Sequence, residues 1–342
     1  MRTKILTISA IVLGAITVML LAALAIIYFG NSGDYTVMAT TADDPTLPAI
    51  EVDGYRFHGE TFGNPANPVL IMLHGGPGSD YRYILPMKKL ADEYFVVFYD
   101  QRGSGLSPRV EAEEHTLEQY ISDLHSFAAT FSPDEKFYLV GHSWGAMLAS
   151  SYLGQHPERI EKVVLAEPGF LDASFRKEWM DATGLGSMSI DLPMLISMIS
   201  SFGKALHVNG PDSQARQDFF MGEFFSGDAT GHPLSGYYVD NDMRNAAGED
   251  WRFSNVASST MQNSVVRPDG SEIDFAQGVG SYSGEVLFIA GSENEIIGPE
   301  YQLRQMERFP DARLEIIEGA GHTMFGEKPE ESMKVIRAYF ER

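Results

Sequence analysis

The residues best suited to chemistry lie in a pentapeptide, Gly-His-Ser-Trp-Gly, at positions 141–145. An apolar run that ends at Val140 precedes it, and the small and apolar residues at 146–153 suit a helix packed on a sheet. A serine on a sharp turn between a strand and a helix is exposed as a nucleophile, and glycines on either side leave room for that turn. The pattern predicts that Ser143 attacks a carbonyl carbon.

A second group of residues is suited to stabilise the negative charge that such an attack creates. His-Gly-Gly-Pro-Gly at 74–78 follows another apolar run, so its backbone N–H groups are expected at the end of a strand. Removing one such donor typically costs about 10²–10³ in rate. We expect the N–H of Gly75 or Gly76 to act together with the N–H of Trp144, the residue after the nucleophile.

The elements that must position these residues follow from a regular alternation along the chain. Short runs rich in β-branched and aromatic residues alternate with segments of helical pattern. This predicts the α/β class, an open and mostly parallel sheet flanked by helices, with functional residues at the carboxyl ends of strands. An antiparallel edge hairpin is expected within 49–62. Further strands are expected at residues 69–73, 95–99, 137–140, 163–166, 286–290 and 314–317.

The interval after the sixth expected strand, at 163–166, is too long for one crossover to the next, at 286–290. Residues 170–283 are therefore expected to form a helical cap inserted into a core made of residues 49–169 and 284–342. The cap is rich in methionine and aromatic residues. Most of these should form the cap's own core, while some line an apolar substrate pocket.

The beginning of the chain indicates a membrane segment. Residues 5–29 are almost uninterrupted apolar, which is long enough to cross a bilayer, and two basic residues precede them. We expect residues 1–30 to be an uncleaved anchor and 31–48 a polar linker, with the catalytic domain outside the cytoplasm. A cleaved signal peptide is the alternative, because Ala-Leu-Ala at 23–25 resembles a cleavage site.

Composition narrows the expected partners. The chain has 47 acidic and 25 basic residues, a net charge of −22, and no cysteine. This acidity argues against nucleic acid as a partner and against adhesion to anionic lipid beyond the anchor. The lack of cysteine excludes a thiol nucleophile, disulfides and metal thiolates. The sequence implies no metal and no organic cofactor, so the expected partners are a small-molecule or short-peptide substrate and the membrane.

Three motifs in this order and spacing, at 74–78, 100–105 (Asp-Gln-Arg-Gly-Ser-Gly) and 141–145, resemble the α/β-hydrolase superfamily. Within it they are most similar to the proline iminopeptidase group of serine peptidases. The resemblance implies cleavage of an N-terminal residue, such as proline, from short peptides. It also implies that His322, in Gly-Ala-Gly-His after the last expected strand, accepts the Ser143 proton and later gives it to the leaving group.

The acid of the implied triad departs from the family's pattern. The family usually places an Asp three residues after the glycine that ends the penultimate strand, and here that position is Asn294. An asparagine cannot carry the charge that stabilises an imidazolium. One possibility is that Glu293 or Glu295, on either side of it, takes the role.

The other possibility is Glu167, which comes directly after the strand expected at 163–166. A subclass of haloalkane dehalogenases has its acid in this place. A carboxylate at a strand end under a cap needs a partner, because an unpaired buried charge is costly. We therefore expect Glu167 to orient His322, with Glu293 and Glu295 as alternatives.

Three functions remain open from the sequence. The first is a proline-iminopeptidase-like serine hydrolase with an acyl-enzyme mechanism, whose cap must then supply a carboxylate for the substrate's ammonium group. The second is a carboxylesterase or lactonase on small apolar acyl substrates, because residues 165–169 differ from the Leu-Arg-Gly expected there in proline iminopeptidases. The third is an inactive binding protein on the same fold. The candidate carboxylates of the cap include Asp218, Glu223, Asp240, Asp242, Glu249 and Asp250.

Overall fold

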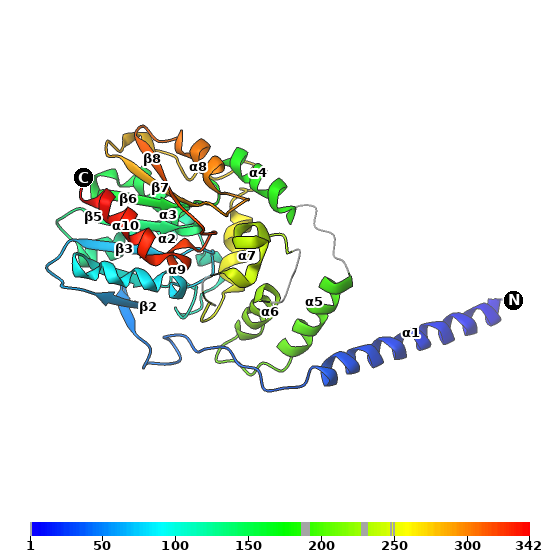
Figure 1. Ribbon diagram of the computed structural model, residues 1–342. Helices are drawn as coiled ribbons and strands as arrows, with labels where there is room; N and C mark the ends of the chain where they lie inside the picture. The colour runs from blue at the N-terminus through cyan, green and yellow to red at the C-terminus, as the bar shows by residue number, and fades with distance from the viewer. Residues whose placement is uncertain (1, 186–191, 227–231, 247, 249) are drawn as a thin grey trace. The chain divides into compact units, whose positions relative to one another are not determined.

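The computed structural model describes residues 2–185, 192–226, 232–246, 248 and 250–342 (Figure 1). An eight-stranded sheet in the order β1-β2-β4-β3-β5-β6-β7-β8 forms its centre. The first two strands pair antiparallel at the edge, and the strands from β3 onward pair parallel, which confirms the expected fold class. The strands are β1 (Ala49–Val52), β2 (Tyr55–Phe62), β3 (Val69–Leu73), β4 (Phe95–Tyr99), β5 (Phe137–His142), β6 (Ile160–Ala166), β7 (Val286–Gly291) and β8 (Ala312–Ile317).

Helices cover both faces of this sheet. Every residue of β3, β4 and β7 is buried, as expected for strands packed on two sides. On one face, α2 (Leu117–Phe131) and α3 (Trp144–Gln155) share an apolar cluster with the sheet. On the other, the 3₁₀ helix η1 (Arg82–Asp92), α9 (Met324–Glu327) and α10 (Pro329–Phe340) do so. The remaining core helix is α8 (Pro299–Met306).

Between β6 and β7 the described residues contain α4 (Ala173–Thr183), α5 (Leu192–Ala205), α6 (Ala215–Ser226) and α7 (Asn255–Ser264). The chain forms two compact units. One comprises Met1–Val37 and Ile190–Gly227, with α1, α5 and α6, and the other comprises Met38–Ser189 and Asp228–Arg342, with the sheet. The segment expected to be a cap therefore contributes to both units.

Helix α1 (Arg2–Gly30) begins the chain. Its segment Leu13–Gly30 has a mean hydropathy of 2.3 and no buried residue, and it is long and apolar enough to cross a membrane. Signal sequences have the same length and composition, so this helix fits either an anchor or a leader.

Candidate active site

Ser143 lies at a sharp turn between β5 and α3. Its backbone has φ 55° and ψ −119°, in the left-handed half of conformational space that costs a non-glycine residue energy. The two glycines of the motif explain how the turn fits. A Cβ on Gly141 would lie 2.3 Å from the Gly145 carbonyl oxygen, and a Cβ on Gly145 would lie 2.5 Å from the Leu73 carbonyl oxygen. Only glycine therefore fits at positions 141 and 145.

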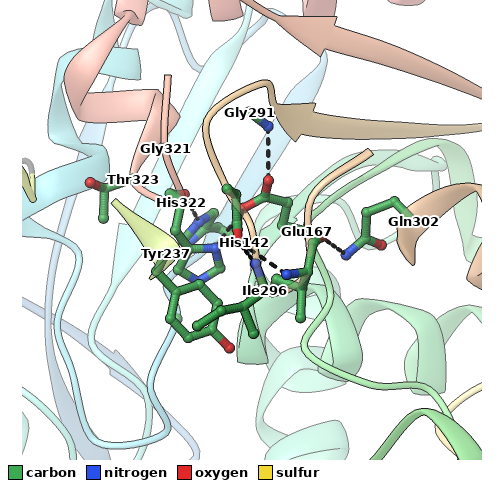
Figure 2. A network of polar contacts seen from close by, with 12 residues as sticks. His142, Glu167, Tyr237, Gly291, Ile296, Gln302, Gly321, His322 and Thr323 are labelled. Atoms are coloured by element: carbon green, nitrogen blue, oxygen red, sulfur yellow. Dashed lines mark hydrogen bonds and ion pairs between the residues drawn. The ribbon is translucent and has the colours of Figure 1, made fainter. Parts of the chain in front are cut away.

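Glu167 and His322 meet at the carboxyl ends of strands (Figure 2). The His322 Nδ1 atom is 2.6 Å from Oε2 of Glu167, whose side chain is fully buried. Glu167 follows β6 directly, with φ 44°, and its N–H donates to the carbonyl of Ile289 in β7 at 2.9 Å. The Gly291 N–H donates to Oε1 of the same carboxylate at 2.8 Å.

Asn294 also contacts this carboxylate. Its Nδ2 donates to Glu167 Oε2 at 2.7 Å, while its Oδ1 accepts the N–H groups of Ile296 and Ile297, each at 3.0 Å. Two backbone donors fix the oxygen end of the amide, so the donor end must face Glu167. The neutral Asn294, at the position where the family usually carries its acid, thus helps to hold the charge of Glu167.

The structure places the two alternative acids elsewhere. Glu293 and Glu295 are exposed, and Glu293 accepts a hydrogen bond from Ser292. Among the described contacts, Glu167 is the carboxylate that His322 Nδ1 meets.

Burial governs the protonation of the pair. It lowers the pKa of His322 to about 3, although the charge of Glu327 opposes this shift, so the imidazole is neutral at neutral pH. Burial raises the pKa of Glu167, against the lowering by the N–H of Gly291 and the amide of Asn294. The N–H of Gly291 and the amide of Asn294 already donate to this carboxylate, and Glu167 accepts the Nδ1–H of His322 as well. This tautomer leaves the Nε2 lone pair free to take a proton.

Ring contacts hold the His322 imidazole in place. The rings of His142 and Tyr237 each lie 4.5 Å from it, and the His322 N–H donates to the Tyr237 carbonyl at 2.7 Å. In the part of the chain that the structure describes, the Ser143 hydroxyl makes no hydrogen bond to His322. Such bonds are often long until a substrate is bound.

A chain of hydrogen bonds joins the loop after β3 to the His322 backbone. The Gly75 N–H donates to the Tyr83 hydroxyl at 2.7 Å, and that hydroxyl is 2.5 Å from Nδ1 of His142. The His142 Nε2 is 2.6 Å from the His322 carbonyl oxygen. A carbonyl only accepts, so Nε2 carries the hydrogen, Nδ1 accepts, and Tyr83 donates to it. Burial lowers the pKa of His142 well below its usual range, which is consistent with this neutral form.

This chain of bonds bears on the expected oxyanion site. The Gly75 N–H donates to Tyr83, so the N–H groups of Gly76 and Trp144 remain as the expected donors. Trp144 is the first residue of α3, where N–H groups have no acceptor within the helix. Its indole Nε1 donates to Gln101 at 2.7 Å, and the Gln101 amide donates to the His74 carbonyl at 2.9 Å, so Gln101 braces both loops.

Replacing Tyr83 with phenylalanine should lower kcat by about tenfold with little change in KM, because the Gly75 loop and His142 lose their common partner. The buried N–H and ring nitrogen left unpaired should also destabilise the fold by about 1–3 kcal/mol. Urea unfolding and steady-state kinetics measure both effects. Tyr94→Phe is the matched control, because Tyr94 is buried and its hydroxyl makes no hydrogen bond among the described contacts. Equal kinetics for the two variants would contradict the prediction.

Asp250 is a cap carboxylate close to the same loop. It accepts a hydrogen bond from the Ser79 hydroxyl at 2.6 Å, and its charge adds to the rise that burial causes in the pKa of Tyr83. The Tyr83 hydroxyl and the Ser143 Cβ each lie 3.0 Å from the position that a Cβ on Gly75 would occupy. Burial raises the pKa of Asp250 itself to about 6. The charge of Asp250 therefore acts on Tyr83, whose hydroxyl lies near the candidate nucleophile.

The other carboxylates expected as candidates in the cap lie in different settings. Glu223 pairs with Lys204, and Asp242 pairs with Arg244. Asp240 is exposed, and Asp218 belongs with Glu223 to the unit that contains α1. Glu249 lies outside the described residues. Within those residues, no group of three or more His, Asp or Glu side chains is arranged to hold a metal ion.

Known proteins resemble this chain along most of its length. A family model described as alpha/beta hydrolase fold matches residues 68–187. Proline iminopeptidase PfmaB of Pestalotiopsis fici is 24% identical over 299 residues, which cover 86% of this chain and 99% of that protein. The crystal structure of proline iminopeptidase from Mycobacterium smegmatis superposes with a TM-score of 0.55 at 18% identity, covering 86% of this chain and 98% of that one. The crystal structure of esterase RhEst1 from Rhodococcus sp. ECU1013 superposes with a TM-score of 0.57 at 18% identity, covering 86% of this chain and 97% of that one.

Proposed function

We propose that this chain, an α/β-hydrolase close to the proline iminopeptidases, is a membrane-anchored serine hydrolase that works through an acyl-enzyme. The observation that carries the proposal is the 2.6 Å contact between His322 and the buried Glu167, in the same site as the strained turn at Ser143. A neutral imidazole whose Nδ1–H is held by a carboxylate presents Nε2 as a base.

In this proposal Ser143 attacks the substrate carbonyl while His322 Nε2 takes the hydroxyl proton. Negative charge develops on the carbonyl oxygen, and the N–H groups of Trp144 and Gly76 stabilise it. When the tetrahedral intermediate collapses, His322 gives the proton to the leaving group. Water then releases the acyl group from Ser143 by the same steps, and Glu167 stabilises the imidazolium formed in each half.

We propose cleavage of an N-terminal residue from small peptides as the reaction. An aminopeptidase must bind a free ammonium group close to the scissile carbonyl. Asp250 supports this, because it bonds the Ser79 hydroxyl and its charge acts on Tyr83, whose hydroxyl lies near Ser143. The similarity to a proline iminopeptidase over 86% of the chain supports the same substrate class.

Replacing Asp250 with asparagine should lower kcat/KM for prolyl- and alanyl-arylamides by about 10²-fold, since a buried charge pair with the ammonium is worth about 2–5 kcal/mol. Short-chain esters have no ammonium, so the preference for arylamides over esters should fall by nearly the same factor. Asp240→Asn, at an exposed carboxylate whose φ of 58° suits asparagine, is the control. An equal loss on both substrate types would mean that Asp250 is structural.

The alternative reaction is hydrolysis of small apolar esters or lactones. The aromatic rings beside the base favour it, because the Tyr237 ring lies 4.5 Å from His322 and its hydroxyl accepts the Trp179 indole N–H at 2.5 Å. Such rings form an apolar wall for an acyl group.

A fluorophosphonate probe tests the proposal as a whole. It reacts only with an activated serine, so the folded wild-type chain should be labelled on one peptide, the one that contains Ser143. A panel of prolyl- and alanyl-arylamides and short-chain esters then separates the two reactions. A folded chain that is neither labelled nor active on any member of the panel would instead be the inactive binding protein.

A further inference from the structure

Helix α5 exposes an apolar face that the proposed reaction does not use. Its exposed apolar side chains recur at intervals of three and four residues, so they lie on one side of the helix. Their exposed fractions run from 39% to 69%, high for large apolar groups in a folded chain. These residues are Leu192, Leu195, Ile196, Ile199 and Phe202.

This helix is attached to the end of α1, within the same compact unit. The Ser200 hydroxyl donates to Oδ1 of Asn31, the residue directly after α1, at 3.1 Å. The His207 Nε2 donates to the Tyr28 carbonyl at 2.7 Å, and the two rings lie 4.2 Å apart. A Cβ on Gly203 would lie 2.5 Å from Asn31 Nδ2, so the two segments approach closely. The ribbon likewise shows α5 beside this end of α1 (Figure 1).

The point of attachment sets the depth of the C-terminal end of α5. The apolar segment Leu13–Gly30 is about 27 Å long as a helix, close to the roughly 30 Å thickness of the hydrocarbon core. Tyr28 lies in the last turn of α1, and tyrosine is enriched at membrane–water interfaces. With α1 across the bilayer, the Ser200 to Asn31 bond holds α5 at the surface where α1 emerges.

We propose that α5 lies in the membrane interface and inserts its apolar face into the lipid, as a second contact beside α1. The inference rests on the proposed membrane anchor. The partner is a lipid bilayer because the apolar face is attached to a helix of membrane length. Attraction to anionic headgroups is not required, because the face carries no charged side chain and Lys204 pairs with Glu223 at 2.5 Å.

The absence of cysteine from the sequence makes a direct test possible. The full chain is placed in phosphatidylcholine vesicles with one environment-sensitive NBD label on a single introduced cysteine. Ile199→Cys reports the apolar face, and Ser197→Cys reports an exposed position on the opposite side of the same helix. Leu20→Cys, about 15 Å along α1 from Gly30, reports the bilayer centre.

Lipids with a nitroxide at carbon 5 or carbon 12 of the acyl chain then quench each label according to its depth. At Ile199 we expect a blue-shifted emission and at least about twofold quenching, stronger with the carbon-5 lipid, as for helices buried about 5–10 Å into the interface. At Leu20 the carbon-12 lipid should quench more strongly. At Ser197 neither lipid should quench, and the Ile199 result should not change when anionic lipid is added.

Each other outcome overturns the proposal in a recognisable way. Quenching at Leu20 without quenching at Ile199 would support the membrane anchor and show that α5 does not enter the membrane. If neither Leu20 nor Ile199 is quenched, α1 does not span the membrane, and the proposal for α5, which rests on that anchor, is wrong as well. A blue shift at Ile199 without lipid quenching, together with disulfide formation between two unlabelled Ile199→Cys chains, would show that a second copy covers the face.

Discussion

Replacing Ser143 with alanine is expected to lower kcat by about 10⁶-fold on whichever substrate the chain hydrolyses best, since losing the nucleophile alone costs about as much as losing a whole triad. The turn should survive, because alanine is smaller than serine at a position where the space is set by Gly141 and Gly145. The measurement is kcat with the best arylamide and the best ester, together with fluorophosphonate labelling and far-UV circular dichroism.

Ser150→Ala provides the matched control for this variant. Ser150 is fully buried further along the same helix, α3, and its hydroxyl has no hydrogen-bond partner among the described residues. Its replacement should leave kcat and labelling unchanged. If Ser143→Ala kept more than a few per cent of the wild-type kcat while folded, another residue would be the nucleophile.

The second large effect is expected at Glu167. Glutamine there should lower kcat by about 10⁴-fold, because an amide nitrogen facing His322 Nδ1 favours the wrong tautomer and removes the charge that stabilises the imidazolium. In this orientation the Gly291 N–H can still donate to the amide oxygen, while the Asn294 amide loses its acceptor, at a cost of about 1–3 kcal/mol. Far-UV circular dichroism checks that the variant is folded. Glu293→Gln and Glu295→Gln are the controls, since both carboxylates are exposed, and each should keep activity within about twofold.

A double variant tests the position of the acid more sharply. With Glu167 present, Asn294→Asp should be harmful, because the two carboxylates would face each other across the present 2.7 Å contact and could not both ionise. In the Glu167→Ala background the same Asn294→Asp change should raise kcat by at least about tenfold, since one carboxylate is restored within reach of His322. If Asn294→Asp lowers kcat when Glu167 is present and raises kcat in the Glu167→Ala background, the result supports the proposed role of Glu167. Loss of activity in both backgrounds, with wild-type activity in Glu167→Gln, would refute it.

The sheet is largely predictable because its strands are buried on two sides. Apolar runs such as Val69–Leu73 and Phe95–Tyr99 have little polar interruption, so their bounds can be read directly from the sequence. Helix α2 is equally clear, since Thr116 precedes an amphipathic stretch and its hydroxyl accepts the Gln119 N–H at 3.1 Å.

The location of the site at strand ends also follows from the sequence, since Ser143, Glu167 and His322 come directly after, or within a short loop of, strands β5, β6 and β8. The contacts around these three residues cannot be predicted from the sequence. Nothing in the local sequence singles out Tyr83, because its role depends on η1 bringing a hydroxyl to His142, 59 residues further along the chain. The same holds for His142, whose position within the turn motif does not reveal its bond to the His322 carbonyl.

The cap shows another limit of sequence reasoning. Periodicity within 170–283 indicates helices, but it does not tell which partner each helix will choose. In the structure α5 and α6 belong with α1, while α4 and α7 belong with the sheet. Contacts as distant as that between Ser200 and Asn31 leave no local pattern in the sequence.

The contact between Asn294 and Glu167 has a consequence for how such a site can evolve. A lineage that began with an aspartate at 294 needs two substitutions to reach the present pair, and the order matters. If asparagine came first, the intermediate would have no carboxylate beside His322. If glutamate came first, the intermediate would hold two acids across the present 2.7 Å contact, which share one proton and retain one negative charge. The second order keeps one negative charge beside His322 at each step, at the lowered activity expected for Asn294→Asp, so in such a lineage the acid after β6 should predate the loss of the acid after β7.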